Sequence, residues 1–126
     1  MTERELKDRT KAFALRVLKL IDTLPDTRAA RVLSEQLGRS GTSVGANYRA
    51  ACSSRSTAEM ISKLSIFEEE ADESAFWFEL IGGHGLMPAA KLDALSREAG
   101  ELTAIMVASR RTLQANNRKS RIQNRK

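Results

Sequence analysis

The residues with the clearest chemical potential are cations near the C-terminal end of the chain. Between Leu102 and Lys126 there are seven basic residues and no acidic one. The seven are Arg110, Arg111, Arg118, Lys119, Arg121, Arg125 and Lys126. Because no carboxylate interrupts the run, we expect it to bind nucleic-acid phosphates, with an affinity that falls as salt rises and ignores base sequence. Arg49 and Arg55, in a smaller basic region, are expected to add to this contact.

Two other uses of the basic run remain open. It could serve only as a solubilising tail. It could also bind an anionic membrane surface, but Ile122 is the only large apolar side chain among the last ten residues, which disfavours insertion. No aromatic residue lies among the cations to stack on bases. Contact with phosphates is therefore the favoured interpretation.

Residues suited to catalysis or metal binding are sparse. The single histidine, His84, lies among three glycines in an expected turn, whereas a general base needs a pocket and an orienting partner. Glu70 and Glu73 have the i, i+3 spacing of a bundle metal site, but the required histidine is missing. Cys52 is the only cysteine, so we interpret it as an ordinary thiol in a reducing compartment. We predict a protein that is not an enzyme and that needs no metal or cofactor.

A run of small residues over 39–51 is expected to form a helix with a packing role. Gly41 and Gly45 are four residues apart, a spacing that favours close approach of a second helix and offsets the cost of glycine in a helix. Asn47 falls on the apolar stripe of this segment, with Ser43 nearby. A buried amide of this kind often fixes the register of packed helices. Direct contact with a ligand is the alternative.

Acidic residues near the tryptophan form a second candidate interface. Glu70, Glu73 and Trp77 share a stripe beside the expected core of the third helical segment. Together with the core stripe, these residues cover more of the helix surface than one bundle face buries. We therefore expect a subunit interface in which these acids meet arginines of a neighbouring copy. The candidate arginines are Arg39, Arg49 and Arg55. Pairing between the second and third helices of one chain is an equal alternative.

Four amphipathic segments must position these residues. In residues 2–24 apolar side chains recur every three or four positions until Pro25 ends the pattern. The next segment, 26–53, has an inward stripe of Ala30, Leu33, Leu37, Ser40, Val44, Asn47 and Ala51. The third begins at a capping box, in which Ser56 accepts from the Glu59 amide and Glu59 reaches back, and it ends at a glycine-rich turn. The fourth begins at Pro88.

Short connections between four such segments predict an all-α fold, an antiparallel up-down-up-down left-handed four-helix bundle. We place the bundle in residues 1–116 and predict that the basic tail, residues 117–126, is disordered because its apolar periodicity is lost. A chain of 126 residues, 41% of them hydrophobic, suffices for one domain. No apolar run approaches the roughly 18 residues of a membrane span, and the charged N-terminus is not a signal peptide. We expect a cytoplasmic protein that does not contact membranes.

The central part of the chain resembles a known family. The likeness is carried by Arg39, Ser43-Val44-Gly45-Ala46-Asn47, Arg55-Ser56, Glu59-Met60-Ile61, Leu64-Ser65-Ile66, Glu70 and Glu73. This pattern resembles the four helix bundle protein family, also known as the 23S ribosomal RNA intervening-sequence proteins. The family's Asn-Ile-Ala-Glu-Gly motif reads Asn47-Tyr48-Arg49-Ala50-Ala51 in this chain. An acid is lost and an arginine gained, so the surface of the second helix is more basic.

The resemblance implies a small bacterial bundle without enzymatic activity that assembles as a ring, usually a homopentamer. It also implies packing and interface roles for Arg39, Ser43, Asn47, Arg55 and Glu70. Two functional hypotheses follow. The first is a ring-forming protein associated with RNA or DNA. The alternative is an interaction scaffold that docks a partner enzyme such as a reverse transcriptase, because the accessory protein of diversity-generating retroelements looks similar to this family.

Overall fold

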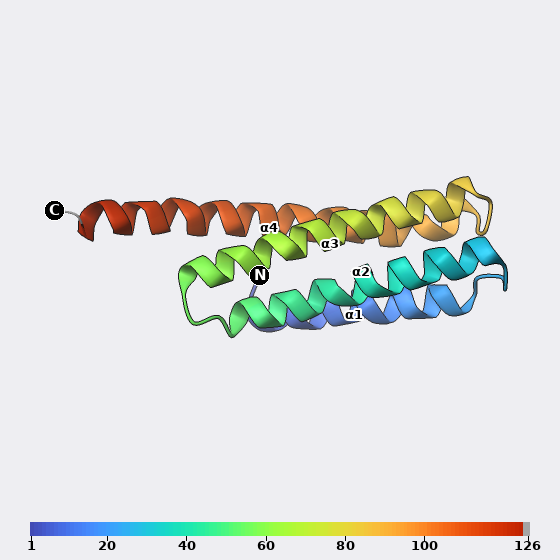
Figure 1. Cartoon of the computed structure of the whole chain (residues 1–126), viewed down its shortest axis with the longest axis horizontal. Helices are drawn as coiled ribbons and strands as arrows, with labels where there is room; N and C mark the ends of the chain where they lie inside the picture. Colours follow the sequence, from blue (N-terminus) through green and yellow to red (C-terminus); the bar gives the residue numbers. More distant parts are fainter. Residues whose placement is uncertain (125–126) are drawn as a thin grey trace.

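The computed structural model describes residues 1–124 and contains four helices and no strand within that range. They are α1 (Glu3–Asp22), α2 (Arg28–Cys52), α3 (Thr57–Gly83) and α4 (Ala89–Asn124). Short connections make successive helices antiparallel (Figure 1). Each helix packs on the next one in the chain, and α1 also contacts α4. The predicted all-α four-helix bundle is confirmed. The seam between α1 and α4 is the least closely packed of the four.

The helix ends follow from local hydrogen bonds. The side chains of Thr2, Thr27 and Ser56 each accept from an amide three residues later, which satisfies an otherwise unpaired N–H of the first turn. The carboxylate of Glu59 does reach back, but it accepts the amide of Arg55 at 3.0 Å, one residue before the expected position. At the end of α3, Gly85 adopts a φ of 79°, the left-handed conformation that glycine tolerates best.

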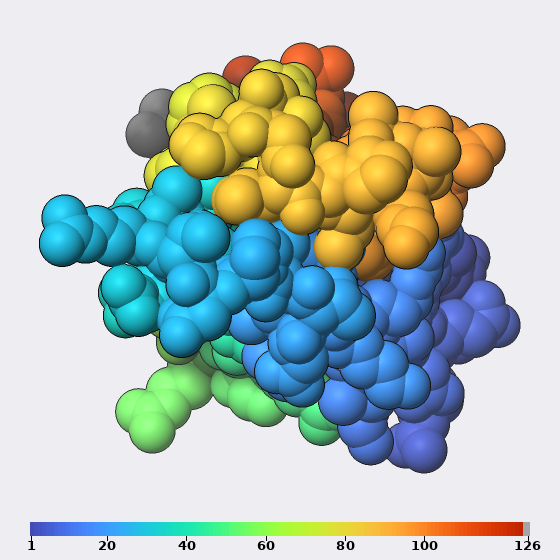
Figure 2. All heavy atoms as spheres, turned by 90° about the vertical axis from the view of Figure 1, so that its right-hand side faces the viewer, coloured from blue at the N-terminus to red at the C-terminus, as the bar shows by residue number. Residues whose placement is uncertain are grey.

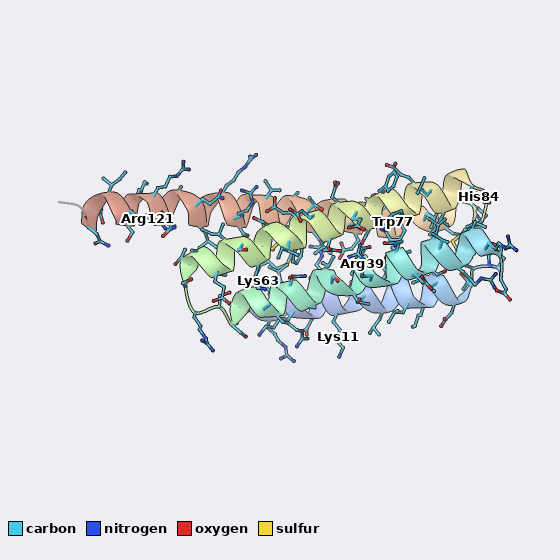
Figure 3. The ribbon with its side chains drawn as sticks, viewed as in Figure 1. Lys11, Arg39, Lys63, Trp77, His84 and Arg121 are labelled. Carbon is cyan, nitrogen blue, oxygen red and sulfur yellow. The ribbon has the colours of Figure 1, made fainter. Side chains whose placement is uncertain are left out.

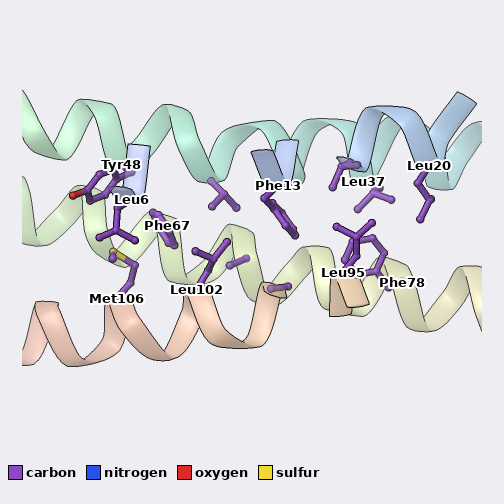
Figure 4. Packing of buried hydrophobic residues seen from close by; sticks show 14 of the residues in the cluster. Leu6, Phe13, Leu20, Leu37, Tyr48, Phe67, Phe78, Leu95, Leu102 and Met106 are labelled. Atoms are coloured by element: carbon purple, nitrogen blue, oxygen red, sulfur yellow. The ribbon is translucent and has the colours of Figure 1, made fainter. Parts of the chain in front are cut away.

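Aromatic side chains from three helices form the centre of the core (Figure 4). Phe13 of α1 and Phe78 of α3 meet edge to face, with ring centroids 6.4 Å apart. Tyr48 of α2 and Phe67 of α3 meet in the same way at 6.1 Å. These two contacts fix the relative levels of the helices along the bundle axis. Buried aliphatic residues, among them Leu37 and Leu102, fill the space between them.

The glycines of α2 bring α1 close, as their spacing predicted. A methyl group at Gly41 would lie 2.9 Å from a γ carbon of Val17, and one at Gly45 would lie 3.3 Å from the Thr10 hydroxyl. A side chain at position 41 would therefore force Val17 to shift, and one at position 45 would make a tight contact with Thr10. The small residues in this part of α2 serve helix packing.

The inward position predicted for Asn47 is wrong, because Tyr48 occupies the core there. Asn47 is half-buried, and its Nδ2 donates to the Ser43 carbonyl oxygen of its own helix at 2.8 Å. The reason lies in packing between helices: Tyr48 meets Phe67 of α3 edge to face, so residue 48 and not residue 47 fills the core at this level, while the other predicted inward residues of α2, including Ala51, are buried. A buried hydrogen bond of 2.8 Å between the hydroxyls of Ser40 and Ser74 instead links α2 to α3.

The disorder expected for the basic tail is also corrected. Residues 117–124 continue α4 as helix, and that end of α4 extends past the α2–α3 connection (Figure 1). Arginine, lysine and glutamine have high helix propensity. Elongating a helix that is already packed needs no new nucleus, so this segment can stay helical without a buried stripe. Arg125 and Lys126 lie outside the described residues.

Candidate nucleic-acid interface

The end of α4 presents four exposed cations. Arg111, Arg118, Lys119 and Arg121 are all exposed, and none has an ion-pair partner among residues 1–124. No acidic residue follows Glu101 in the sequence. The positive charge of this end is therefore not neutralised by its own helix. We call Arg111, Arg118, Lys119 and Arg121 the α4 cation group.

Three of the four cations lie on one side of the helix. Arg118 and Arg121 follow Arg111 by seven and ten residues, so the three side chains fall within about a quarter turn of one another. At 1.5 Å per residue they are spread over about 15 Å along the axis. Figure 3 shows Arg121 near the end of α4, beyond the other helices. This arrangement can meet several phosphates of one nucleic-acid strand together.

Arg110 is separated from this group although it is adjacent in sequence. Its Nε and Nη2 both donate to the Glu68 carboxylate of α3, the latter at 3.0 Å, and its Nη1 donates to Gln114 at 2.9 Å. The hydrogen bond with Glu68 raises the pKa of Arg110. A two-pronged pair of this geometry is strong and directional. Arg110 therefore ties α4 to α3, and we leave it out of the candidate interface.

The two other predicted cations lie near the same end of the bundle. Arg55 is exposed in the connection between α2 and α3, and Arg49 is exposed in the last turn of α2. That connection lies at the same end of the molecule as the C-terminal part of α4 (Figure 1). The fold thus gathers Arg49, Arg55 and the α4 cation group at one end.

The acidic residues predicted at a subunit interface have partners within the chain. Arg39 of α2 lies 3.1 Å from a Glu70 oxygen and also pairs with Glu73 of α3. The indole Nε1 of Trp77 donates to Glu73 at 3.3 Å. Figure 3 shows Arg39 and Trp77 on these neighbouring helices. For Arg39 the structure shows the pairing within one chain that was the alternative. Ser43, the other predicted interface residue here, donates to the Arg39 carbonyl oxygen.

A third ion cluster closes the seam between α1 and α4, and it was not predicted. Arg9 donates to Glu98 through Nε at 2.8 Å and through Nη2 at 2.5 Å, and Nη2 also reaches Glu101 at 2.5 Å. The hydrogen bond from Arg9 lowers the pKa of Glu98. The available signal was the i, i+3 spacing of the two acids on the flank of the α4 stripe. Only the packing of α1 on α4 identifies their partner.

The catalytic candidates remain isolated. Cys52 is half-buried, and burial raises the pKa of its thiol, which disfavours the reactive thiolate. His84 is exposed in the turn between α3 and α4. Within residues 1–124 no three histidine, cysteine, aspartate or glutamate side chains come together as metal ligands. No helix in this range has the length and hydropathy to cross a membrane.

Comparison with known proteins relates this architecture to one family. Residues 3–108 match the family described as 23S rRNA-intervening sequence protein. No curated protein matches the chain. A solved structure from Bacteroides thetaiotaomicron VPI-5482, described as a protein with unknown function from the S23 ribosomal protein family, is similar with a TM-score of 0.82 and 31% sequence identity. The likeness covers 88% of this chain and 99% of that one. The chain therefore belongs to the 23S rRNA-intervening sequence protein family.

Proposed function

We propose that this protein is a non-enzymatic, ring-forming bundle that binds RNA through the end of α4. The observation that carries the proposal is the α4 cation group, which is exposed and without ion-pair partners among the described residues. Arg49 and Arg55 extend the positive surface at the same end of the bundle. The family description makes RNA the first nucleic acid to test. We propose a cytoplasmic location for this activity.

The physical basis is release of counterions from phosphates. Each phosphate neutralised by a lysine or arginine lowers the slope of log affinity against log salt by about 0.7 to 0.9. Four cations on a preformed helix would give a slope of roughly −3 to −4. Arg39 and Arg110 add little, because carboxylates already neutralise them. The contact has no stacking aromatic, so it discriminates weakly between base sequences.

The match to the family ends at residue 108, before the first member of the α4 cation group. The basic end therefore lies outside the part of the chain that defines membership. We interpret it as an addition that gives this bundle its own affinity for nucleic acid.

The test compares salt dependence between two charge-matched variants. Fluorescence anisotropy with a labelled RNA hairpin and a DNA duplex gives affinity at several salt concentrations. Changing Arg118, Lys119 and Arg121 together to glutamine should weaken binding and reduce the salt slope by about 2 to 3. The control changes three exposed cations away from this end, Arg28, Lys91 and Arg97, to glutamine. Equal losses in both variants, or no binding by the unmodified protein at low salt, would contradict the proposal.

The alternative is a scaffold that docks a partner enzyme such as a reverse transcriptase. The observation in its favour is an exposed apolar surface on α3, where Phe76 is 49% exposed and its ring lies 5.2 Å from that of Trp77. Under this alternative a charge at Phe76 abolishes partner binding and leaves affinity for RNA unchanged. We give the nucleic-acid proposal precedence because we assign this apolar surface to contact with a second copy of the chain.

A further inference from the structure

Two surfaces of the bundle expose apolar side chains to solvent. On α1, Leu15 is 50% exposed and Leu18 is 44% exposed. On the other surface, Val32 of α2 is 60% exposed, and Phe76 and Leu80 of α3 are 49% and 37% exposed. A shallow groove of about 530 Å³ opens beside Leu80. It is lined by Ala29, Val32, Leu33, Leu80, Gly83 and His84. We call these surfaces the α1 face and the α2–α3 groove.

The two surfaces lie on different sides of the molecule. Figure 2 views the bundle end-on, with α2 and α3 at the left and α1 and α4 at the right. Within α1, Leu15 follows the core residue Leu6 by nine positions, which at 100° per residue places it opposite the core. The α1 face and the groove therefore cannot touch within one chain, and one copy leaves both uncovered.

The charges around the two surfaces are complementary. Lys11 and Lys19 flank the exposed leucines of α1, and both are exposed. The acids of that helix are at its ends or are matched, as Asp8 is by Arg4 at 3.5 Å. Exposed acids flank the apolar residues of α3, namely Glu69, Asp72 and Glu79. None of these three has an ion-pair partner among residues 1–124. The exposed leucines of α1 thus have basic neighbours, and the exposed apolar residues of α3 have acidic ones.

The two surfaces also lie at the same level along the bundle. Phe13 of α1 and Phe78 of α3 are in contact, and both helices run in the same direction (Figure 1). On α1, the exposed residues Leu15 and Leu18 lie two and five residues after Phe13. On α3, Phe76 lies two residues before Phe78 and Leu80 two residues after it. At 1.5 Å per residue all four fall within about 11 Å along the axis. Lys7 and Asp72 are each six residues before the contact, so they share a level too.

From this match we propose that the α1 face of one copy packs into the α2–α3 groove of the next copy. Leu18 enters the groove beside Leu80 and Val32, and Lys7 faces Asp72, which lies at the same level. The equal levels mean that a rotation about an axis parallel to the bundle brings the surfaces together without sliding. Because the surfaces are unlike, the contact is head-to-tail and repeats until a ring closes. This inference rests on the ring of the proposed function and assigns its interface.

The test uses two variants that each break one surface. Leu18→Lys places a charge on the α1 face, and Leu80→Lys places one in the groove. Light scattering should show an oligomer for the unmodified protein and a single chain of 14.0 kDa for each variant. Mixing the two variants should then give a one-to-one complex, because one intact face meets one intact groove. The control, Ile122→Lys, changes an exposed apolar residue on α4 and should keep the full mass.

The outcomes separate the interface from the ring. A complex on mixing supports a head-to-tail contact, since neither a face-to-face nor a groove-to-groove contact would be restored. If the unmodified protein is an oligomer and both variants keep its mass, the ring survives and this interface is wrong. If the variants fall to single chains but do not combine, the contact is not head-to-tail. A single chain for the unmodified protein would refute both. Circular dichroism confirms that each variant keeps its helix content.

Discussion

Arg110 and Arg111 show how differently two regions of this molecule treat the same side chain. Arg110 lies over the bundle and binds Glu68 of α3. Arg111 is exposed and has no ion pair among the described residues. One step along a helix turns the side chain by about 100°, which is enough to move it from a partner to solvent. The type of residue is the same, so position around α4 separates cations that hold the fold from cations available to a ligand.

The same contrast holds for the bundle as a whole. Between its helices, Arg9, Arg39 and Arg110 each pair with one or two glutamates. At the extended end of α4, no carboxylate of residues 1–124 pairs with a cation of the α4 cation group. The packed region is therefore close to neutral at its seams, and the extension keeps an uncompensated positive charge. The packed region serves stability, and the extension carries the cations that we propose bind RNA.

The largest effect should separate the packed region from the extension by stability. Phe78 is 1% exposed, and Phe78→Ala should lower the free energy of unfolding by about 3–5 kcal/mol through lost burial and the cavity left behind. Ile122→Ala, at a residue 57% exposed, should change it by less than about 0.5 kcal/mol. Urea denaturation followed by circular dichroism measures both. Comparable losses would mean that the extension is packed in solution.

A pair of glycine substitutions tests the close approach of α1 and α2. Gly41→Ala should destabilise the protein by about 1–3 kcal/mol, because the new methyl group meets buried Val17. Gly100→Ala has nothing within 4 Å of the new methyl group. It should stabilise by about 0.5–1 kcal/mol through helix propensity. Thermal and urea unfolding report both signs, and a gain in stability for Gly41→Ala would show that the helices are less closely packed than described.

Alanine substitutions at Arg110 and Arg111 test directly whether one arginine stabilises the fold and the other binds RNA. Arg110→Ala leaves Glu68, whose side chain is only 14% exposed, without its partner, and should cost about 1 kcal/mol of stability. Its salt slope for RNA binding should stay unchanged. Arg111→Ala should leave stability within about 0.5 kcal/mol and reduce the salt slope by about 1. Unfolding curves and anisotropy titrations give the two readouts. If Arg110→Ala reduced the salt slope and Arg111→Ala reduced stability, the roles assigned to the two arginines would be wrong.

The smallest expected effect is the loss of folding stability at low pH. Hydrogen bonds from Arg9 hold the pKa of Glu98 below its usual value. A depressed pKa in the folded state adds stability above the ordinary glutamate pKa of about 4.3, and this stability is lost as pH falls through the folded-state pKa. The unmodified protein should therefore lose more stability than Glu98→Gln between about pH 5 and pH 3. Urea midpoints measure this, with exposed Glu79→Gln as the control; parallel curves for all three would exclude the pair as a source of acid sensitivity.

Much of the fold could be predicted because it depends on local patterns. The buried side chains of α1, including Phe13 and Val17, are those of the predicted stripe. Gly41 and Gly45 indicated a close helix contact, which the structure contains. The error at Asn47 arose because residues 47 and 48 both lie close to the inward stripe of α2. Only the contact of Tyr48 with Phe67 of α3 decides which of them is inside.

The candidate site was less predictable, because ion pairs depend on what lies across a helix seam. The sequence identified Arg110 and Arg111 as equivalent cations, and only the position of Glu68 distinguishes them. The link from Arg9 to Glu98 joins residues 89 positions apart. No spacing rule within one helix connects such a pair. The extension of α4 was missed for another reason: a polar helix can elongate from a packed one without a periodic stripe of its own.

The sequence by itself determined four amphipathic helices, their inward faces and a C-terminal excess of positive charge. These depend on side-chain periodicity, turn residues and composition, which act over a few residues. Only the tertiary structure decided which cations are neutralised, how far α4 extends and which apolar residues stay exposed at matching levels of α1 and α3. Those features depend on the distance between side chains of different helices, and that distance exists only once the helices have packed.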